Sequence, residues 1–254
     1  MSDKNYVISE EYILPSNGKI YSQKVNPVVR LRSMTTNDEM KRLAPSERPY
    51  KNLCDIIDDC LIDDPGISSY DMCLADYQYL LHKLRVVTYG ADYKLEFQCP
   101  WCLTTETATL NLDELEVVTA ENIDIESLLH FDLPVTHKHI ALRMQTPRII
   151  DDITIQEKEF ERKSKGSQGD SAFLFTLIAT IESVDGDKLD YIQKEKFIRD
   201  LPMKDTNYIT KKAQKLVDAF GIDTIIHRTC PKCGVDYAGS FRLTKEFFGP
   251  SIDE

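Results

Sequence analysis

The chain has 254 residues, a formal net charge of −11 and 42% hydrophobic residues, which is enough apolar content for one sizeable domain or two modest ones. The negative charge disfavours a surface that binds nucleic-acid backbones, because such surfaces are basic. The first six residues lack the basic and apolar regions of a signal peptide, and the longest apolar run, residues 173–181, falls short of the roughly 20 residues that span a bilayer. We therefore expect a soluble intracellular protein without a membrane partner.

The first 92 residues predict short strands followed by helices. Residues 15–18 form a turn signal, and residues 19–21 and 28–32 are expected to be short strands. Thr36 and Glu39 have the spacing of a capping box, which predicts a short helix that ends near Pro45.

Two further helices are expected before residue 92. The apolar face of the first is formed by Leu53, Ile56, Ile57, Cys60 and Leu61. Ser68 and Asp71 predict a capping box at the start of the second, which ends at Gly90. Cys54, Cys60 and Cys73 occupy apolar helical positions, so we interpret them as buried free thiols in a reducing compartment.

Two short cysteine turns are the strongest chemical signal in the chain. Cys99 and Cys102 enclose Pro-Trp, Cys230 and Cys233 enclose Pro-Lys, and strand-like sequence flanks both pairs. Four thiolates brought together in this way suit one tetrahedral structural Zn²⁺, with Gly234 permitting the positive φ of the second turn. Redox CxxC motifs or metal-free thiols are the alternatives. A thioredoxin-like motif follows a strand and opens a helix, and neither pair does.

The stretch after the first turn contains a further strand and a weaker metal candidate. Residues 135–144 read as a strand with Ile140, Leu142 and Met144 facing inward. His137 and His139 share the opposite face, where they form either an exposed polar face or a metal-binding pair; the exposed face is favoured because no third ligand is near in sequence.

The second half of the chain is expected to be helical. Thr146 and Pro147 predict a helix start, and the Ser/Gly-rich residues 163–169 are the best hinge candidate. The apolar helix at 173–181 must be covered by this chain or by a partner. Further helices are predicted at 187–201 and 205–220.

No catalytic motif is recognisable. The chain lacks a Walker P-loop, a GxSxG elbow, an HExxH motif and a Gly-rich dinucleotide fingerprint. We therefore expect a protein that is not an enzyme and has no small-molecule substrate.

Several short motifs resemble the T-even bacteriophage baseplate-hub assembly family. In chain order they are LPSNG at 14–18 with Tyr21, VRLRSMT at 29–35 with Glu39, LRVVTYG at 84–90, CPWC at 99–102, CPKCG at 230–234 and FFGPS at 247–251. The resemblance implies a hub component or assembly chaperone that binds other hub subunits, in the host cytoplasm during assembly and, if it is retained, in the virion tail.

The resemblance leaves the binding surface open. Trp101 is either an interface anchor or a cover for the ribbon core, while Phe247 and Phe248 either dock onto a partner or close this fold. The helical half is the first candidate for the binding surface. The alternative function is a zinc-ribbon regulator that binds the transcription machinery or nucleic acid; a basic groove beside the ribbon would favour it, and an acidic or apolar exposed face would favour assembly.

Together these signals predict an α+β fold, mostly helical, with short strands and a split four-cysteine zinc ribbon closed by CxxC pairs far apart in sequence. The expected parts are N-terminal strands and helices (1–92), the split ribbon (93–118 with 226–248), a strand region (119–147) and a helical insertion (148–225), all within one compact unit.

Overall fold

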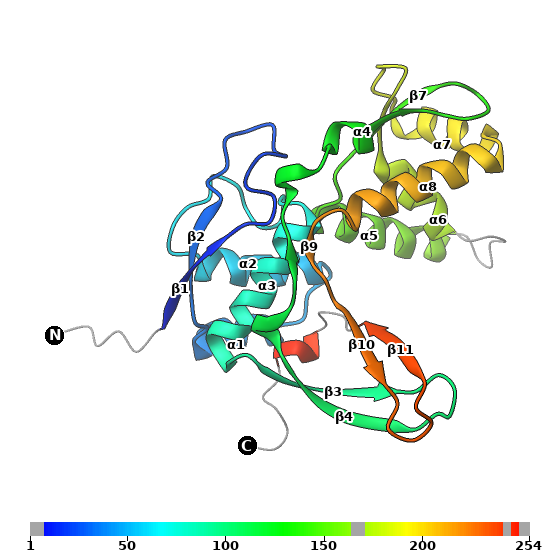
Figure 1. Ribbon diagram of the computed structural model, residues 1–254. Helices are drawn as coiled ribbons and strands as arrows, with labels where there is room; N and C mark the ends of the chain where they lie inside the picture. Colours follow the sequence, from blue (N-terminus) through cyan, green and yellow to red (C-terminus); the bar gives the residue numbers. More distant parts are fainter. Residues whose placement is uncertain (1–7, 164–170, 241–244, 249–254) are drawn as a thin grey trace.

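The computed structural model describes residues 8–163, 171–240 and 245–248 (Figure 1). The α-helices are α1 (Thr36–Leu43), α2 (Pro49–Cys60), α3 (Leu74–Tyr89), α4 (Ile125–Leu129), α5 (Pro147–Lys163), α6 (Ser171–Thr180), α7 (Tyr191–Asp200) and α8 (Met203–Val217). Short 3₁₀ turns are η1 (Leu112–Glu114), η2 (Ala120–Asn122) and η3 (Lys245–Phe248). The strands are β1 (Ser9–Ile13), β2 (Val28–Arg32), β3 (Asp92–Gln98), β4 (Thr105–Asn111), β5 (Val117–Val118), β6 (His130–Asp132), β7 (His139–Leu142), β8 (Ile181–Val184), β9 (Gly221–Ile222), β10 (Ile225–Thr229) and β11 (Asp236–Ser240).

The strands form small antiparallel sheets rather than one large one. Four sheets of the described chain have two strands, β1-β2, β3-β4, β5-β9 and β10-β11, and the fifth has the order β6-β7-β8. This mixture of helices and small sheets confirms the predicted α+β class.

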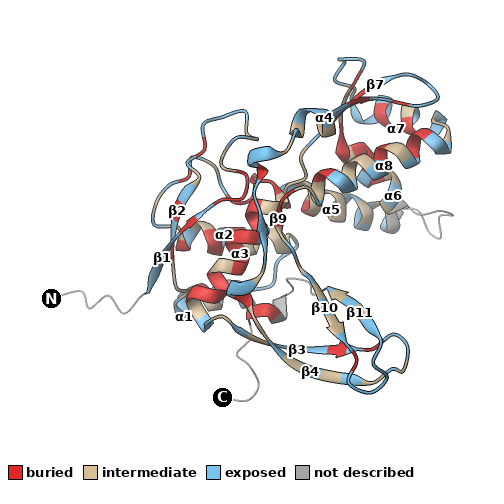
Figure 2. Cartoon of the chain, in the orientation of Figure 1, coloured by how far each residue is buried: buried red, intermediate tan, exposed pale blue. Residues whose placement is uncertain are grey.

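The first hydrophobic core surrounds α3. Leu80, Leu81 and Leu84 of this helix are buried, and they lie in one cluster with Ile56 and Ile57 of α2. The inner faces of β1 and β2 and the 3₁₀ turn η3 belong to the same cluster. Figure 2 shows buried residues along α2 and α3, with a second group in the half of the molecule that contains α6, α7 and α8. The helix α3 ends where Gly90 adopts φ of 88°, which agrees with the expected stop.

A second core lies in the half of the molecule that contains α6, α7 and α8. Buried residues of α6 pack with the sheet β6-β7-β8, with Ile198 of α7 and with Ile209 of α8. The apolar helix expected at residues 173–181 is therefore largely covered by its own chain, although Phe173 is exposed. Ile181 leaves the helix and starts β8.

Buried carboxylates tie distant segments together. Asp76 on α3 accepts hydrogen bonds from the Ser16 N–H at 2.9 Å and hydroxyl at 2.5 Å and from the Tyr21 hydroxyl at 2.7 Å. Asp151 on α5 accepts from the backbone N–H groups of Tyr50 (3.2 Å) and Lys51 (2.9 Å), in the first turn of α2. Such buried charges persist only when their oxygens are satisfied.

Some predicted boundaries are wrong. Residues 19–21 form turns and bends instead of a strand, because the Tyr21 hydroxyl donates a hydrogen bond to the buried Asp76. The cap of α1 is Thr35 with Asp38, one residue earlier than expected. The helix α3 starts at Leu74 rather than near Ser68, since the Leu74 N–H is held by the Gln145 carbonyl.

The expected strand over residues 135–144 is also too long. Only His139–Leu142 forms a strand, because the preceding residues turn around Asp205, which accepts from the Val135 and Thr136 N–H groups at 2.9 Å each. The helices at 187–201 and 205–220 are observed as α7 and α8 with different bounds.

Two expectations are left open. The hinge candidate at 163–169 lies, apart from its first residue, outside the described residues, and the division of the chain into parts stays a prediction. No helix among the described residues is long and apolar enough to cross a membrane.

Candidate metal centre

The two cysteine turns close the ends of two β-hairpins. The first turn joins β3 to β4, in which Gln98 pairs with Thr105. The second joins β10 to β11, in which Thr229 pairs with Asp236. Figure 1 shows the hairpins reaching together away from the helical core. This is the predicted ribbon, assembled from segments on either side of residues 112–224.

Both turns use the same backbone hydrogen bonds. The Cys99 N–H donates to the Thr104 carbonyl at 2.9 Å, and the Leu103 N–H donates to the Cys99 carbonyl at 3.0 Å. In the second turn the Cys230 N–H donates to the Val235 carbonyl at 3.0 Å, and the Gly234 N–H donates to the Cys230 carbonyl at 2.9 Å. The repeated pattern presents both cysteines of each turn to one point.

The four sulfur atoms of Cys99, Cys102, Cys230 and Cys233 lie within 4.8 Å of one another. Across the hairpins, Cys99 Sγ is 3.7 Å from Cys233 Sγ, and Cys102 Sγ is 3.6 Å from Cys230 Sγ. A metal with bonds of about 2.3 Å to four tetrahedral thiolates places the sulfurs about 3.8 Å apart. The arrangement fits such an ion, and all four cysteines are free of disulfides.

Without a metal the clustered thiols do not ionise alike. The hydroxyl of Thr104, 3.3 Å from Cys102 Sγ, and its backbone N–H lower the pKa of Cys102 to about 6. The pKa of Cys233 is raised to about 12: the Val235 N–H lowers it, but desolvation and the other three cysteines outweigh that hydrogen bond. A divalent cation removes this competition because it binds cysteines as thiolates.

The space between the hairpins is filled by Phe97 of β3. The Arg228 guanidinium lies over the Phe97 ring, 4.9 Å from its centroid, and is paired with Glu106 of β4 at 2.5 Å. Gly239 of β11 faces the same ring, where an added Cβ would come within 3.1 Å of it. The ribbon thus has an aromatic and ionic interior of its own beside the cysteines.

The residues expected to contact partners differ in position. Trp101 is 72% exposed at the tip of the first turn, so it does not cover the ribbon core. Phe247 and Phe248 are 0% and 1% exposed, against α3 and Tyr93. The suggestion that these two rings dock onto a partner is corrected: they close this fold, and Arg85 Nε donates to the Phe247 carbonyl at 3.0 Å.

Sequence inspection missed Leu103 and Thr104. Leu103 adopts φ of 57° and thereby repeats the turn that Gly234 makes with φ of 70°. The only sequence signal is that Leu103 follows its second cysteine at the position that Gly234 occupies in the other turn. Nothing in the residue type of Thr104 marked it as a neighbour of Cys102.

The histidine candidates do not form a comparable centre. His137 lies in a turn, whereas His139 stacks on His130 with ring centroids 5.8 Å apart and shares a hydrogen bond of 2.9 Å with Asp132. Among the described residues, one group of three or more metal-binding side chains has its ligand atoms close together, and this group is the four cysteines.

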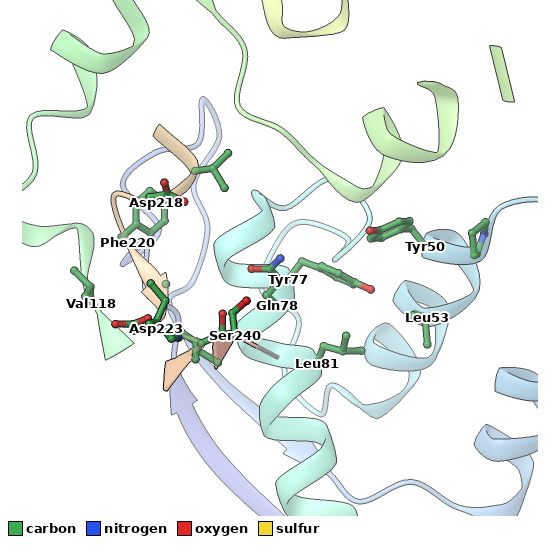
Figure 3. A pocket seen from close by; sticks show the side chains of 16 residues that line it. Tyr50, Leu53, Tyr77, Gln78, Leu81, Val118, Asp218, Phe220, Asp223 and Ser240 are labelled. Carbon is green, nitrogen blue, oxygen red and sulfur yellow. The ribbon is translucent and has the colours of Figure 1, made fainter. Parts of the chain in front are cut away.

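A cavity of about 860 Å³ lies between the helices α2 and α3 and the segment that leads from α8 into β10 (Figure 3). Its walls include Tyr50, Leu81 and Phe220, with the carboxylates of Asp218 and Asp223 at one side. The described lining contains no cysteine or histidine.

Comparison with known proteins places the chain in a family. The family model described as T4 bacteriophage base plate protein matches residues 6–249, which is nearly the whole sequence. The chain therefore belongs to the T4 base plate protein family. Comparisons with curated proteins and with solved structures gave no match.

Proposed function

We propose that this baseplate protein acts by binding other proteins of the tail baseplate hub, either as a hub component or as an assembly chaperone. One structural zinc ion holds its ribbon together, and the protein performs no reaction of its own. The observation that carries the proposal is the exposed apolar tip of the first cysteine turn, in a chain whose family is that of phage baseplate proteins.

Zinc is the metal that the four cysteines suit best. A set of four thiolates in tetrahedral arrangement selects Zn²⁺ or iron, and zinc provides folding energy without redox chemistry. Because all four positions are taken by sulfur, no site is left for a reacting water. The role of the ion is to join two turns that are distant in sequence.

The tip of the ribbon offers an anchor for a partner. Trp101 is 72% exposed and Leu103 67% exposed, and both belong to the first turn. Pro100 beside them is also exposed. Large apolar side chains at the end of a rigid turn form a preorganised contact, since little entropy is lost when a partner covers them.

The same tip argues against the regulator hypothesis. Contact with nucleic acid requires a basic surface, whereas the chain carries a net charge of −11 and the tip of its first turn is apolar. Arg228 within the ribbon is paired with Glu106. By the criterion that separated the two hypotheses, the exposed apolar tip supports the assembly role.

The assembly role sets where the protein works. We infer that it meets its partners in the cytoplasm of the infected host, where baseplates are assembled. A hub component would then remain in the virion tail, and a chaperone would leave before the particle is complete.

The test is co-expression of the chain with the other baseplate proteins of its phage, followed by size-exclusion chromatography with light scattering. We expect a stable complex with a hub protein, and we expect Trp101→Ala to weaken it at least tenfold. Tyr191→Ala is the matched control, because Tyr191 is an exposed aromatic residue of α7.

Each outcome separates the parts of the proposal. Failure to bind any baseplate protein would contradict the assembly role. A complex that Tyr191→Ala weakens and Trp101→Ala leaves intact would move the contact from the ribbon tip to the helical half.

A further inference from the structure

Among the described residues, one edge of the sheet β1-β2 has no backbone partner. The register pairs Glu10 with Leu31 and Tyr12 with Val29. Just beyond the two ends, the Ser33 N–H donates to the Ile8 carbonyl and the Leu14 N–H donates to the Pro27 carbonyl, each at 2.8 Å. In an antiparallel pair, hydrogen-bonded residues alternate with residues that are not, so the even-numbered residues of β1 bond to β2.

The odd-numbered residues of β1 therefore turn their backbone groups away from β2. These are Ser9, Glu11 and Ile13, and no described residue forms a backbone hydrogen bond with them on that side. The far edge of β2, in contrast, is covered: the Ile62 N–H donates to the Arg30 carbonyl at 2.8 Å. Figure 1 shows β1 at the margin of the molecule, beside the N-terminal end.

The described part of β1 has only some of the devices that usually protect an edge. It is short, with five residues, and carries Glu10 and Glu11, but it has no proline and no bulge in its register. Ile13 is exposed beside its exposed cross-strand neighbour Val28, and Ile8 is exposed at the other end. An added strand would lie beside Ile13 and pair three residues of free backbone.

Charge identifies the kind of strand that fits. A second copy of this chain, paired antiparallel about Glu11, would set Glu11 opposite Glu11, and this register alone pairs all three open residues of β1. Pairing about Glu10 sets Glu10 opposite Glu10, and pairing about Tyr12 sets Glu11 opposite Ile13, but each leaves one open residue without a partner in the second β1. Like charges directly opposite each other destabilise a pair, so the self-pairing that uses all three open residues is disfavoured. A basic residue opposite Glu11 turns the same position into a favourable contact.

We propose that β1 is a docking edge for an extended segment of another baseplate protein, which adds a strand with Lys or Arg opposite Glu11 and an apolar residue opposite Ile13. Backbone hydrogen bonds supply the affinity in this mode of recognition, and the alternating side chains supply the specificity. The inference rests on the proposed assembly function and adds a second contact to the one at Trp101.

The experiment uses Glu11→Pro in the full chain. Proline removes an N–H that the β1-β2 pairing does not use, so the variant keeps its fold while an incoming strand loses its bond. Glu11→Lys reverses the charge and leaves the backbone free. The control is Glu126→Lys, the same charge change at an exposed position on α4.

The probe is the baseplate protein that co-purifies with the wild-type chain. We expect both Glu11 variants to weaken its binding at least tenfold and Glu126→Lys to bind normally. Glu11→Pro should keep the wild-type melting temperature, whereas Glu11→Lys, which faces Arg30 across the β1-β2 pair, should melt slightly lower. Hydrogen exchange at the amides of Ser9, Glu11 and Ile13 should slow at least tenfold in the complex.

The alternatives give different results. A stable complex in which those amides exchange as before, or which Glu11→Pro binds as tightly as the wild type, overturns the docking edge and leaves the assembly role standing. Self-association of the wild type that Glu11→Lys abolishes would assign the edge to a second copy. Absence of any complex overturns the assembly role and this inference together.

Discussion

Leu103 and Gly234 occupy the same position in the two cysteine turns, one residue after the second cysteine, with φ of 57° and 70°. Each donates its backbone N–H to the carbonyl of the first cysteine of its turn. The left-handed conformation is free for glycine but costs an L-residue roughly 1–2 kcal/mol. The first turn thus stores a strain that the second avoids, and its exposed leucine side chain belongs to the same turn as Trp101.

Leu103→Gly is expected to stabilise the protein by about 0.5–1 kcal/mol, because relief of the left-handed strain exceeds the entropy that glycine loses on folding. Gly234→Leu should cost about 1–2 kcal/mol; apart from its two chain neighbours, no described residue has an atom within 4 Å of the position of an added Cβ, so the cost is conformational. Urea denaturation of metal-loaded proteins measures both. Equal stability of Gly234→Leu and the wild type would contradict the strain.

Replacing Cys102 and Cys233 with Ser should release the metal and lower the melting temperature by at least about 10 °C, because metal-binding energy at such a site is folding energy. Metal content and calorimetry are measured on the same sample. Cys60→Ala is the control, since Cys60 is a buried thiol outside the cluster. A doubly substituted protein that melts like the wild type would contradict a metal site formed by the four cysteines.

Asp38 should give the protein part of its sensitivity to acid. The Arg32 guanidinium, 2.7 Å away, and the Thr35 N–H lower the pKa of Asp38 from 3.8 to about 2. A carboxyl whose pKa is lower in the folded state contributes stability that is present above pH 3.8 and is lost as pH falls toward 2.

Asp38→Asn should therefore lower the free energy of unfolding at pH 7 by about 1–2 kcal/mol and flatten the stability curve between about pH 4 and pH 2. Denaturant titrations at several pH values test this. An unchanged slope in that range would show that Asp38 is not linked to folding.

Asp76→Ala should cost about 3–5 kcal/mol, because it leaves the buried N–H and hydroxyl of Ser16 and the hydroxyl of Tyr21 without their acceptor. Asp71→Ala removes an exposed ion pair with Arg148 and should cost less than about 1 kcal/mol. The two free energies of unfolding are compared directly. Similar losses would mean that the buried carboxylate does not anchor the loop at Ser16.

The sequence predicted those parts of the fold that depend on residues close to one another along the chain. The two cysteine turns, the strands beside them and the end of α3 at Gly90 follow from residue type and spacing. The start of α5 at Pro147 is also as predicted, with the Ile149 N–H donating to the Thr146 hydroxyl at 3.3 Å. The prediction that the four sulfurs meet joined residues that are far apart in sequence, and the structure places them together.

The elements that were predicted wrongly or missed depend on contacts between residues that are distant in sequence. Tyr21 leaves its predicted strand for a carboxylate that lies 55 residues further along the chain. The strand β1 was not predicted at all, since Glu10 and Glu11 interrupt the alternation of polar and apolar residues. The burial of Phe247 and Phe248 depends on α3 and Tyr93, and their apolar character alone fits a partner contact equally well.

X-ray absorption at the zinc edge, combined with metal analysis of the purified wild-type protein, is the sharpest test of the four-cysteine zinc site. We expect one zinc per chain with four sulfur neighbours at about 2.3 Å. A chain without zinc, or a zinc bound through nitrogen and oxygen, would contradict the four-cysteine clip on which the ribbon and its exposed tip depend.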